Sequence, residues 1–312
     1  MRAFLFPGQG SQSVGMGVAL SEASRAARDV FEQVDEALGQ NLFRLMRDGP
    51  DDALRLTENA QPAIMANSLA VFAALTHDGG VELAKAGQFV AGHSLGEYSA
   101  LCAAGSFDLA TTAKLLKLRG QAMQAAVPVG VGAMAALLGA DVALAQKIAD
   151  AAAQGEVCTV ANDNDPGQVV LSGHKGAIDR AIELAKEMGA KRAVPLPVSA
   201  PFHCPLMQPA AEAMQDALSY IVVADPAVPL YANVTAAAET DPDRIRSLLV
   251  DQVTGMVRWR ESIAAMADAG VDEFIELGGK VLGPMVKRTA PEVKVTSVVT
   301  IEDVEALAKE IA

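Results

Sequence analysis

The pentapeptide Gly92-His93-Ser94-Leu95-Gly96 places a serine between two glycines, each two residues away. An apolar run, Phe89–Ala91, precedes it and an alanine-rich segment follows it, which indicates a strand, a tight turn and a helix. Such a turn strains the backbone and exposes the serine hydroxyl, and its glycines avoid collisions between strand and helix. The helix N-terminus favours negative charge there. We therefore predict a nucleophile elbow with Ser94 as the nucleophile; the alternative is a glycine-rich helix start with an ordinary N-cap serine.

Strands and helices alternate on both sides of this motif. Apolar runs predict strands over 3–6, 88–91, 228–231, 274–277 and 295–298. Helical spacing of apolar residues predicts helices over 19–38, 61–75, 109–125, 205–218, 242–253 and 281–288, and from 304 onward. This alternation is typical of an α/β fold with a mostly parallel sheet covered on both faces.

The middle of the chain has a different order of elements. Strand, helix, strand, strand, helix and strand are predicted over 132–138, 142–153, 157–161, 168–171, 177–188 and 192–196, with a turn at NDNDPG. This β-α-β-β-α-β order is the ferredoxin-like pattern. Proline-containing segments, 128–130 and 195–197, flank it as boundaries. We therefore predict an inserted ferredoxin-like subdomain over 127–198, within a larger domain formed by 1–126 and 199–312.

A serine nucleophile needs a base, and the chain has only four histidines. His93 lies inside the elbow, where its side chain is poorly directed toward Ser94. His77 lies in a polar turn and His174 opens a helix of the predicted insert, so both are expected to be structural or exposed. His203 lies where the chain re-enters the larger domain, and loops at such junctions commonly line clefts. His203 is the candidate base; the alternative is a buried structural imidazole.

The tetrahedral intermediate at such a serine needs N–H donors for its oxyanion. The N–H that follows the nucleophile, Leu95, is one candidate. The glycine-rich loop 7–12 after the first strand could present a second. This loop lacks the GxxxxGK[ST] pattern of a phosphate-binding loop and the GxGxxG pattern of a dinucleotide fold.

Composition excludes several classes of function. A net charge of −13 disfavours a nucleic-acid-binding protein. Three cysteines without a paired spacing favour a reducing compartment. The N-terminal apolar run is too short for a signal segment, and no stretch reaches the roughly 18 apolar residues of a membrane span. We therefore expect a cytoplasmic protein that binds neither nucleic acid nor membrane.

Six segments together carry a resemblance to a known family. PGQGSQ, GHSLGEYSAL, KLRGQAM, NDNDPGQVVLSG, PLPVSAPFH and DQV…VRW occur in the order found in the malonyl-CoA:acyl carrier protein transacylase family. The resemblance extends over nearly the whole chain. It implies an α/β-hydrolase-like core with a ferredoxin-like insert, and transfer of malonyl from malonyl-CoA to a carrier thiol through a malonyl-serine in fatty acid synthesis. It implies coenzyme A as a product and no permanently bound cofactor or metal.

The resemblance also implies roles for individual residues. Ser94 is similar to the family's nucleophile and His203 to its base. Gln9 and Leu95 match the backbone oxyanion donors. Gln252 matches the position whose main-chain carbonyl orients the histidine, so the family works with a dyad that lacks a carboxylate.

Further positions concern the substrates. Arg119 matches the arginine that holds the malonyl carboxylate, and Phe202 resembles the pattern of malonyl-selective relatives. Coenzyme A and acyl carrier proteins are acidic, so an acidic chain must meet them with a local basic patch. Lys191 and Arg192 are the candidates for carrier contact, with Lys114, Lys117, Lys287 and Arg288 as further members. We expect a monomer.

Three other functions are open at this stage. A hydrolase or thioesterase would add an acidic residue between serine and histidine, and Asp163 and Asp165 are available but fall in the insert. A stand-alone acyltransferase that loads polyketide synthase carriers would share the same chemistry. A non-catalytic scaffold would leave Ser94 unreactive. Cys204 beside His203 is expected to be a buried free thiol rather than a nucleophile.

Overall fold

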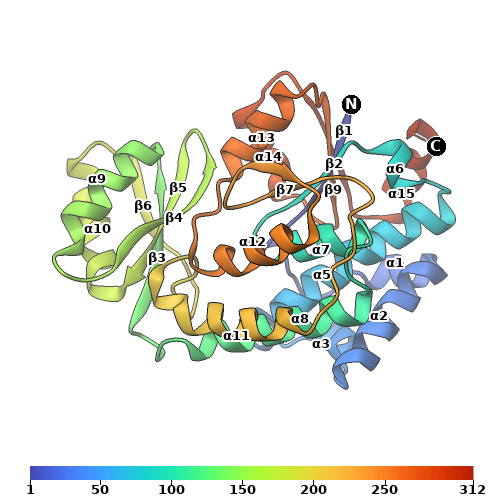
Figure 1. The fold of residues 1–312 in the computed structure, drawn as a ribbon, viewed down its shortest axis with the longest axis horizontal. Helices are drawn as coiled ribbons and strands as arrows, with labels where there is room; N and C mark the ends of the chain where they lie inside the picture. Colours follow the sequence, from blue (N-terminus) through green and yellow to red (C-terminus); the bar gives the residue numbers. More distant parts are fainter. Residues whose placement is uncertain (312) are drawn as a thin grey trace.

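The structure is a computed structural model that describes residues 1–311, and it contains two sheets (Figure 1). The larger sheet has the strand order β10-β9-β1-β2-β7-β8. Its strands are β1 (Arg2–Phe6), β2 (Phe89–Gly92), β7 (Leu230–Ala232), β8 (Ala237–Glu239), β9 (Glu273–Leu277) and β10 (Lys294–Val298). All neighbours are parallel except β7 and β8, which form an antiparallel pair. The predicted α/β class with a mostly parallel sheet is confirmed.

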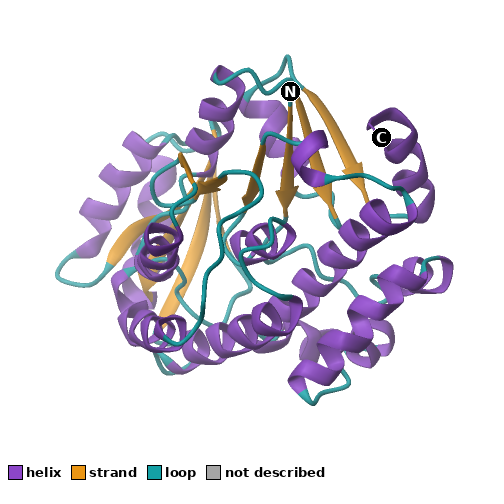
Figure 2. Cartoon of the chain, turned by 45° about the vertical axis from the view of Figure 1, so that its right-hand side comes forward, coloured by secondary structure: helices purple, strands orange, loops and turns teal. Residues whose placement is uncertain are grey.

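Helices cover both faces of this sheet (Figure 2). They are α1 (Val18–Ala23), α2 (Arg25–Leu38), α3 (Leu42–Asp48), α4 (Asp51–Arg55), α5 (Thr57–Ala73), a π-helix η1 (Ala74–Asp78), α6 (Leu83–Ala86), α7 (Gly96–Ala103), α8 (Leu109–Ala125), a 3₁₀ turn η2 (Pro205–Met207), α11 (Gln208–Ser219), α12 (Pro242–Thr254), α13 (Trp259–Asp268), α14 (Leu282–Thr289) and α15 (Ile301–Ile311). Within residues 1–311, none of the helices has the length and apolar character needed to cross a membrane.

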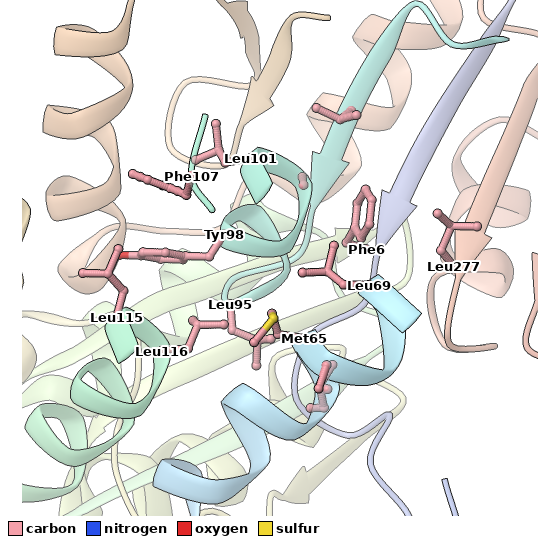
Figure 3. Packing of buried hydrophobic residues seen from close by; sticks show 14 of the residues in the cluster. Phe6, Met65, Leu69, Leu95, Tyr98, Leu101, Phe107, Leu115, Leu116 and Leu277 are labelled. Atoms are coloured by element: carbon pink, nitrogen blue, oxygen red, sulfur yellow. The ribbon is translucent and has the colours of Figure 1, made fainter. Parts of the chain in front are cut away.

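The first strand shows why both faces must be covered. Side chains alternate across a strand, and here both sets are apolar and buried. Phe4 and Phe6 face the cluster that contains α2, α5, α7 and α8, whereas Ala3 and Leu5 face the cluster with α13 and α14. In Figure 3, Phe6 and Leu69 pack beside α7, and Tyr98 reaches from α7 to α8. The helix that follows the nucleophile is therefore held firmly inside the core.

The smaller sheet belongs to the middle of the chain, and Figure 1 shows it beside the larger one. Its strands are β3 (Gly132–Leu138), β4 (Cys158–Asp165), β5 (Gln168–His174) and β6 (Arg192–Pro195), with α9 (Val142–Ala153) and α10 (Lys175–Glu187) between them. The antiparallel order β4-β5-β3-β6 and the sequence of elements are those expected of a ferredoxin-like unit. The exact boundaries, 127 and 198, stay a prediction.

The two faces of the smaller sheet have different partners. Ala135, Leu137 and Leu171 pack with α9 and α10 in a cluster of their own. Met134 and Val170, on the opposite face, pack into the core of the larger domain. The inner face of the insert therefore lies against the larger domain, and it forms one wall of the site described below.

Some expected elements differ from those observed. The sequence NDNDPG at 162–167 was expected to be a turn; Pro166 and Gly167 do form a turn, whereas the segment 162–165 continues β4 with two bulges. Its side chains find partners in the larger domain, among them Arg260 and Arg288, which compensates for their turn preference. The helices α3, α4, α6 and α13 and the strand β8 were not predicted.

Candidate active site

Ser94 lies at the tight turn between β2 and α7, with its backbone in the left-handed region at φ 53°. A Cβ atom on Gly92 would lie 1.9 Å from Gly96 C, and one on Gly96 would lie 2.2 Å from Phe6 O. Both positions therefore require glycine. This is the geometry of a nucleophile elbow, in which strain is maintained by tight packing of strand and helix.

Asn233 closes this elbow from the neighbouring strand. It follows β7, and its side-chain Oδ1 accepts a hydrogen bond from Ser94 N at 2.8 Å. Its Nδ2 donates to Gly92 O at 2.7 Å. Sequence reasoning missed Asn233, although its position gives a signal, because polar residues at the carboxyl ends of parallel strands commonly line ligand sites.

His203 meets the serine hydroxyl directly. Its Nε2 lies 2.8 Å from Ser94 Oγ, and its Nδ1 lies 2.8 Å from the main-chain oxygen of Gln252. The carbonyl can only accept, so Nδ1 carries the proton and Nε2 is free to accept from the hydroxyl. His203 also has a left-handed backbone, φ 56°, and is 4% exposed. The imidazole is therefore held in the tautomer that a base requires.

The surroundings of His203 keep the imidazole neutral. Burial, together with the positive charge of Arg119, lowers the pKa of His203 to about 3. A positive imidazolium would be poorly solvated at this position and repelled by the guanidinium. His203 is therefore an unprotonated base across the whole neutral range of pH.

Arg119 projects from α8 toward the same hydroxyl and is 1% exposed. Its Nη2 donates to Ser94 Oγ at 3.1 Å and to Gln252 Oε1 at 2.8 Å, and its Nη1 donates to Gln61 Oε1 at 2.8 Å. Burial lowers the pKa of Arg119, yet an arginine remains charged in a protein. Among residues 1–311, no carboxylate forms an ion pair with this guanidinium, and Nε has no hydrogen-bond partner. The site therefore contains a buried positive charge suited to a carboxylate ligand.

These side chains line a cavity of about 320 Å³ between the two parts of the molecule. The elbow, His203 and Arg119 lie at one wall; Met134, Val170 and other residues of the insert form the opposite wall. Phe202, 8% exposed, also lines it. Lys191, directly before β6, and Arg192, the first residue of β6, are exposed and lie outside this lining.

The two expected oxyanion donors also line the cavity. The parallel register of β1 and β2 pairs Phe6 with Gly92, which brings the loop after each strand to the same edge of the sheet. Gln9 and Leu95 both contact the cavity. Within the described part of the chain, neither main-chain N–H donates to another protein group, so both are available to a ligand.

The remaining histidines and the nearby cysteine lie outside the catalytic arrangement. His93 Nε2 lies 2.8 Å from Asn164 Oδ1, which joins the elbow to the insert. His77 is exposed, and His174 Nδ1 accepts from Val157 N. Cys204 Sγ donates to Pro201 O, and burial raises the pKa of this thiol, which keeps it protonated.

The acidic residues that a hydrolase triad would require are engaged elsewhere. Asp163 pairs with Arg260, and Asp165 pairs with Arg288; both aspartates are almost completely buried. His203 Nδ1 faces a main-chain carbonyl instead of a carboxylate. Gln61 was another polar member of the site that the sequence did not reveal.

Known acyltransferases are similar to this chain over nearly its whole length. Residues 3–301 match the family described as "Acyl transferase domain". Malonyl CoA-acyl carrier protein transacylase of Escherichia coli K12 is 45% identical over 287 residues, which cover 92% of each chain. The crystal structure of acyl-carrier-protein-S-malonyltransferase from Bartonella henselae has a TM-score of 0.97 and 52% identity, and the match covers 99% of each chain.

A second similar structure contains a carrier. It is a type II polyketide synthase acyl-carrier protein in complex with its malonyl-transacylase, and the match has a TM-score of 0.95, 37% identity and 99% coverage of each chain. The resemblance inferred from the sequence motifs is thus confirmed.

Proposed function

This chain belongs to the acyl transferase domain family, and from that membership we propose that it moves malonyl from malonyl-CoA to the phosphopantetheine thiol of an acyl carrier protein, as a malonyltransferase of fatty acid synthesis. We infer that the acyl group is malonyl because the guanidinium of Arg119 is buried in the site. It lies 3.1 Å from the candidate nucleophile and has no carboxylate partner within residues 1–311. A diacid thioester brings the missing negative charge.

In the first half-reaction Ser94 Oγ attacks the thioester carbonyl carbon of malonyl-CoA. His203 Nε2 takes the hydroxyl proton as the new oxygen–carbon bond forms. The tetrahedral intermediate then collapses, the carbon–sulfur bond breaks, and the imidazolium returns a proton to the departing thiolate of coenzyme A. The product is a malonyl ester of Ser94, and no step requires a bound cofactor or metal.

The main-chain N–H groups of Leu95 and Gln9 serve as the oxyanion donors in this proposal. Both contact the cavity and are free of internal partners in the described chain. Loss of one such donor costs about 3 kcal/mol of transition-state stabilisation in a comparable enzyme site. Because the donors belong to the main chain, their position is fixed by the elbow and by the loop after β1.

Arg119 selects the acyl group. A guanidinium binds a carboxylate through two parallel hydrogen bonds, each worth about 1.5–3 kcal/mol. With acetyl-CoA the cation would gain no such partner. Phe202 lines the cavity, and we propose that its bulk limits substituents on the malonyl carbon. Gln252 orients His203 through its main-chain oxygen.

In the second half-reaction the carrier thiol attacks the malonyl ester. His203 accepts the thiol proton and returns one to Ser94 Oγ as the ester bond breaks. We propose that Lys191 and Arg192, which are exposed and have no ion-pair partner among residues 1–311, contact the acidic carrier. Lys117 and Arg288 are already paired with Glu58 and Asp165. All proposed site residues come from one chain, so a monomer suffices.

Loading of polyketide synthase carriers is the second candidate function. The similar malonyl-transacylase that forms a complex with a type II polyketide synthase carrier supports it. The two functions share one chemistry and differ only in the carrier.

Intact mass spectrometry tests the proposal. After mixing with malonyl-CoA, the wild-type chain should gain the mass of one malonyl group, and Ser94→Ala should gain none. Addition of a phosphopantetheinylated carrier should return the chain to its original mass. Rapid release of free malonate without a carrier would instead indicate a hydrolase, and absence of any adduct would exclude a Ser94 nucleophile.

A further inference from the structure

A buried carboxylate that the mechanism above does not use lies directly behind the site. Glu97, in the first turn of α7, is 1% exposed. Its Oε2 accepts hydrogen bonds from Asn233 N at 2.9 Å and from Gln252 Nε2 at 3.0 Å. Removing a carboxyl group from water is costly unless it is hydrogen-bonded, so a glutamate at this position must have a specific role in the local network.

The contact with Gln252 determines which end of the amide faces Arg119. Gln252 Nε2 donates to Glu97 and to the main-chain oxygen of Ser94 at 3.0 Å. Gln252 Oε1 is thereby turned toward Arg119 Nη2, at 2.8 Å. A reversed amide would direct N–H groups at the guanidinium and its carbonyl at the carboxyl group of Glu97. Both contacts would be repulsive while Glu97 Oε2 acts as an acceptor, so Glu97, together with the main-chain oxygen of Ser94, fixes the side-chain orientation that holds the cation.

The contact with Asn233 connects Glu97 to the nucleophile, Ser94, in a second way. Glu97 holds the main-chain N–H of Asn233, whose side chain joins Ser94 N to Gly92 O across the elbow. One carboxyl oxygen therefore supports both the backbone of the nucleophile and the cation beside it. Glu97 itself is separated from the hydroxyl of Ser94 by these two residues.

We propose that Glu97 is a positioning residue for acyl selection, which holds Gln252 and Asn233 so that Arg119 and Ser94 meet one malonyl group together. This inference rests on the proposed function, since it assigns a support to the guanidinium that binds the malonyl carboxylate. The part that Glu97 plays is that of a hydrogen-bond acceptor. Burial raises the pKa of Glu97 to about 7, so a neutral acceptor is compatible with the site.

The isosteric variant Glu97→Gln keeps a hydrogen-bond acceptor but removes the ionisable group, so it tests hydrogen bonding separately from charge. Asn233 N and Gln252 Nε2 both donate to Glu97 Oε2, and Oε1 has no partner in the described chain. A glutamine can therefore place its amide oxygen where Oε2 lies and its amino group where Oε1 lies. Single-turnover loading of Ser94 is measured with malonyl-CoA and with acetyl-CoA. Glu97→Gln should keep both rates within about threefold of wild type, whereas Glu97→Ala should lower the malonyl-to-acetyl ratio by about tenfold or more, the effect of losing one oriented charge-assisted bond.

Two further variants separate positioning from simple loss of stability. Glu97→Asp keeps a carboxyl group but is too short to reach both donors, and it should also lower the ratio; it replaces Glu97→Ala if that variant does not fold. Glu273→Gln serves as a control, because it changes another buried glutamate, which lies at the start of β9 and forms an ion pair with Arg2. It should leave the ratio unchanged.

Opposite results overturn the inference in distinct ways. If the shortened variants lose both rates equally, with the ratio preserved, Glu97 only stabilises the fold. If Glu97→Gln is as defective as Glu97→Ala, charge and not hydrogen-bond acceptance is what matters. A failure of the proposed function itself would be recognised separately, because the wild-type chain would then acquire no malonyl group at Ser94.

Discussion

The guanidinium of Arg119 lies 3.1 Å from the hydroxyl of Ser94, so the cation that we propose to select the acyl group is also a direct neighbour of the nucleophile. A malonyl ester on Ser94 places its free carboxylate only a few bonds from the attacked oxygen. The carboxylate and the reacting carbon can therefore be bound together in one compact site. This proximity links recognition to chemistry, because a diacid that binds Arg119 necessarily approaches Ser94.

The first prediction concerns Arg119→Ala. Loss of two charge-assisted bonds should lower the rate of malonyl loading by at least about 100-fold, while acetyl loading should stay the same or rise. Single-turnover mass spectrometry with each thioester measures both rates. Arg119→Lys should recover only part of the malonyl rate, since an ammonium does not bind a carboxylate through a planar fork. Equal losses for malonyl and acetyl would show that Arg119 supports the site without selecting the acyl group.

The second prediction concerns pH. The pKa of His203 in the folded chain is about 3, so the imidazole remains a free base between pH 5 and 7. The rate of malonyl loading should therefore change by less than about twofold over this range, whereas a histidine with the ordinary pKa of 6.5 would lose about 25-fold. Quenched-flow measurements of the acyl-enzyme test this, with circular dichroism at pH 5 as a control for folding. A tenfold fall centred near pH 6.5 would contradict the neutral imidazole.

Part of this site could be predicted from the sequence because its geometry is encoded locally. Gly92 is required by its contact with Gly96, four residues further on, and a short pattern reveals both glycines, although Gly96 itself is required by its approach to Phe6 on the neighbouring strand. The main-chain oxygen of Gln252 has no residue signature of its own, and only the family resemblance pointed to it. The candidate base could be narrowed to His203 by its position, but its contact with Ser94 joins residues that are 109 positions apart.

The segment 162–165 shows a limit of sequence reasoning. Asn and Asp favour turns when considered alone, yet here they extend a strand. Their side chains are compensated by arginines that lie 97 and 123 positions further along the chain. A pattern confined to a few neighbouring residues contains no information about such partners, so the local preference for a turn was misleading.

The third prediction concerns Glu97 and the stability of the fold. Burial raises the pKa of Glu97 from 4.5 to about 7, so the folded chain binds this proton more tightly than the unfolded chain. The resulting stabilisation is fully present below pH 4.5 and is lost as pH rises through 7, and it amounts to about 3 kcal/mol. The free energy of unfolding of wild type, relative to Glu97→Gln, should therefore fall by about this amount between pH 4.5 and 8.

Urea unfolding of both chains at several pH values measures this difference. Comparing the two chains removes the opposite contribution of His203, whose lowered pKa gives stability above pH 6.5 that is lost as pH falls toward 3. A difference that does not vary with pH would show that Glu97 titrates at its ordinary pKa in the folded chain.

The fourth prediction concerns the carrier surface. The double change Lys191→Glu with Arg192→Glu reverses two exposed charges at the start of β6. The KM for the carrier should rise by about tenfold at low salt, with less effect at high salt because surface charges are screened. Malonyl loading from malonyl-CoA should be unchanged, and Lys85→Glu, on α6, serves as a control for a change of surface charge. An unchanged carrier KM would remove these residues from the interface.

The last prediction concerns the ion pair between the insert and the larger domain. Arg260, on α13, binds both carboxylate oxygens of Asp163 on β4, and Asp163 is 1% exposed. Arg260→Ala leaves a buried carboxylate without its cation, which should lower the free energy of unfolding by about 2 kcal/mol, a value reduced from that of a fully buried pair because Arg260 is 35% exposed. Arg260→Ala combined with Asp163→Asn should recover part of the loss, since the buried charge is then absent. As a control, Lys175→Ala breaks an exposed ion pair within the insert and should lower the free energy of unfolding by well under about 1 kcal/mol. Urea unfolding measures all of these variants. An equally small effect of Arg260→Ala would refute a stabilising contact at this boundary.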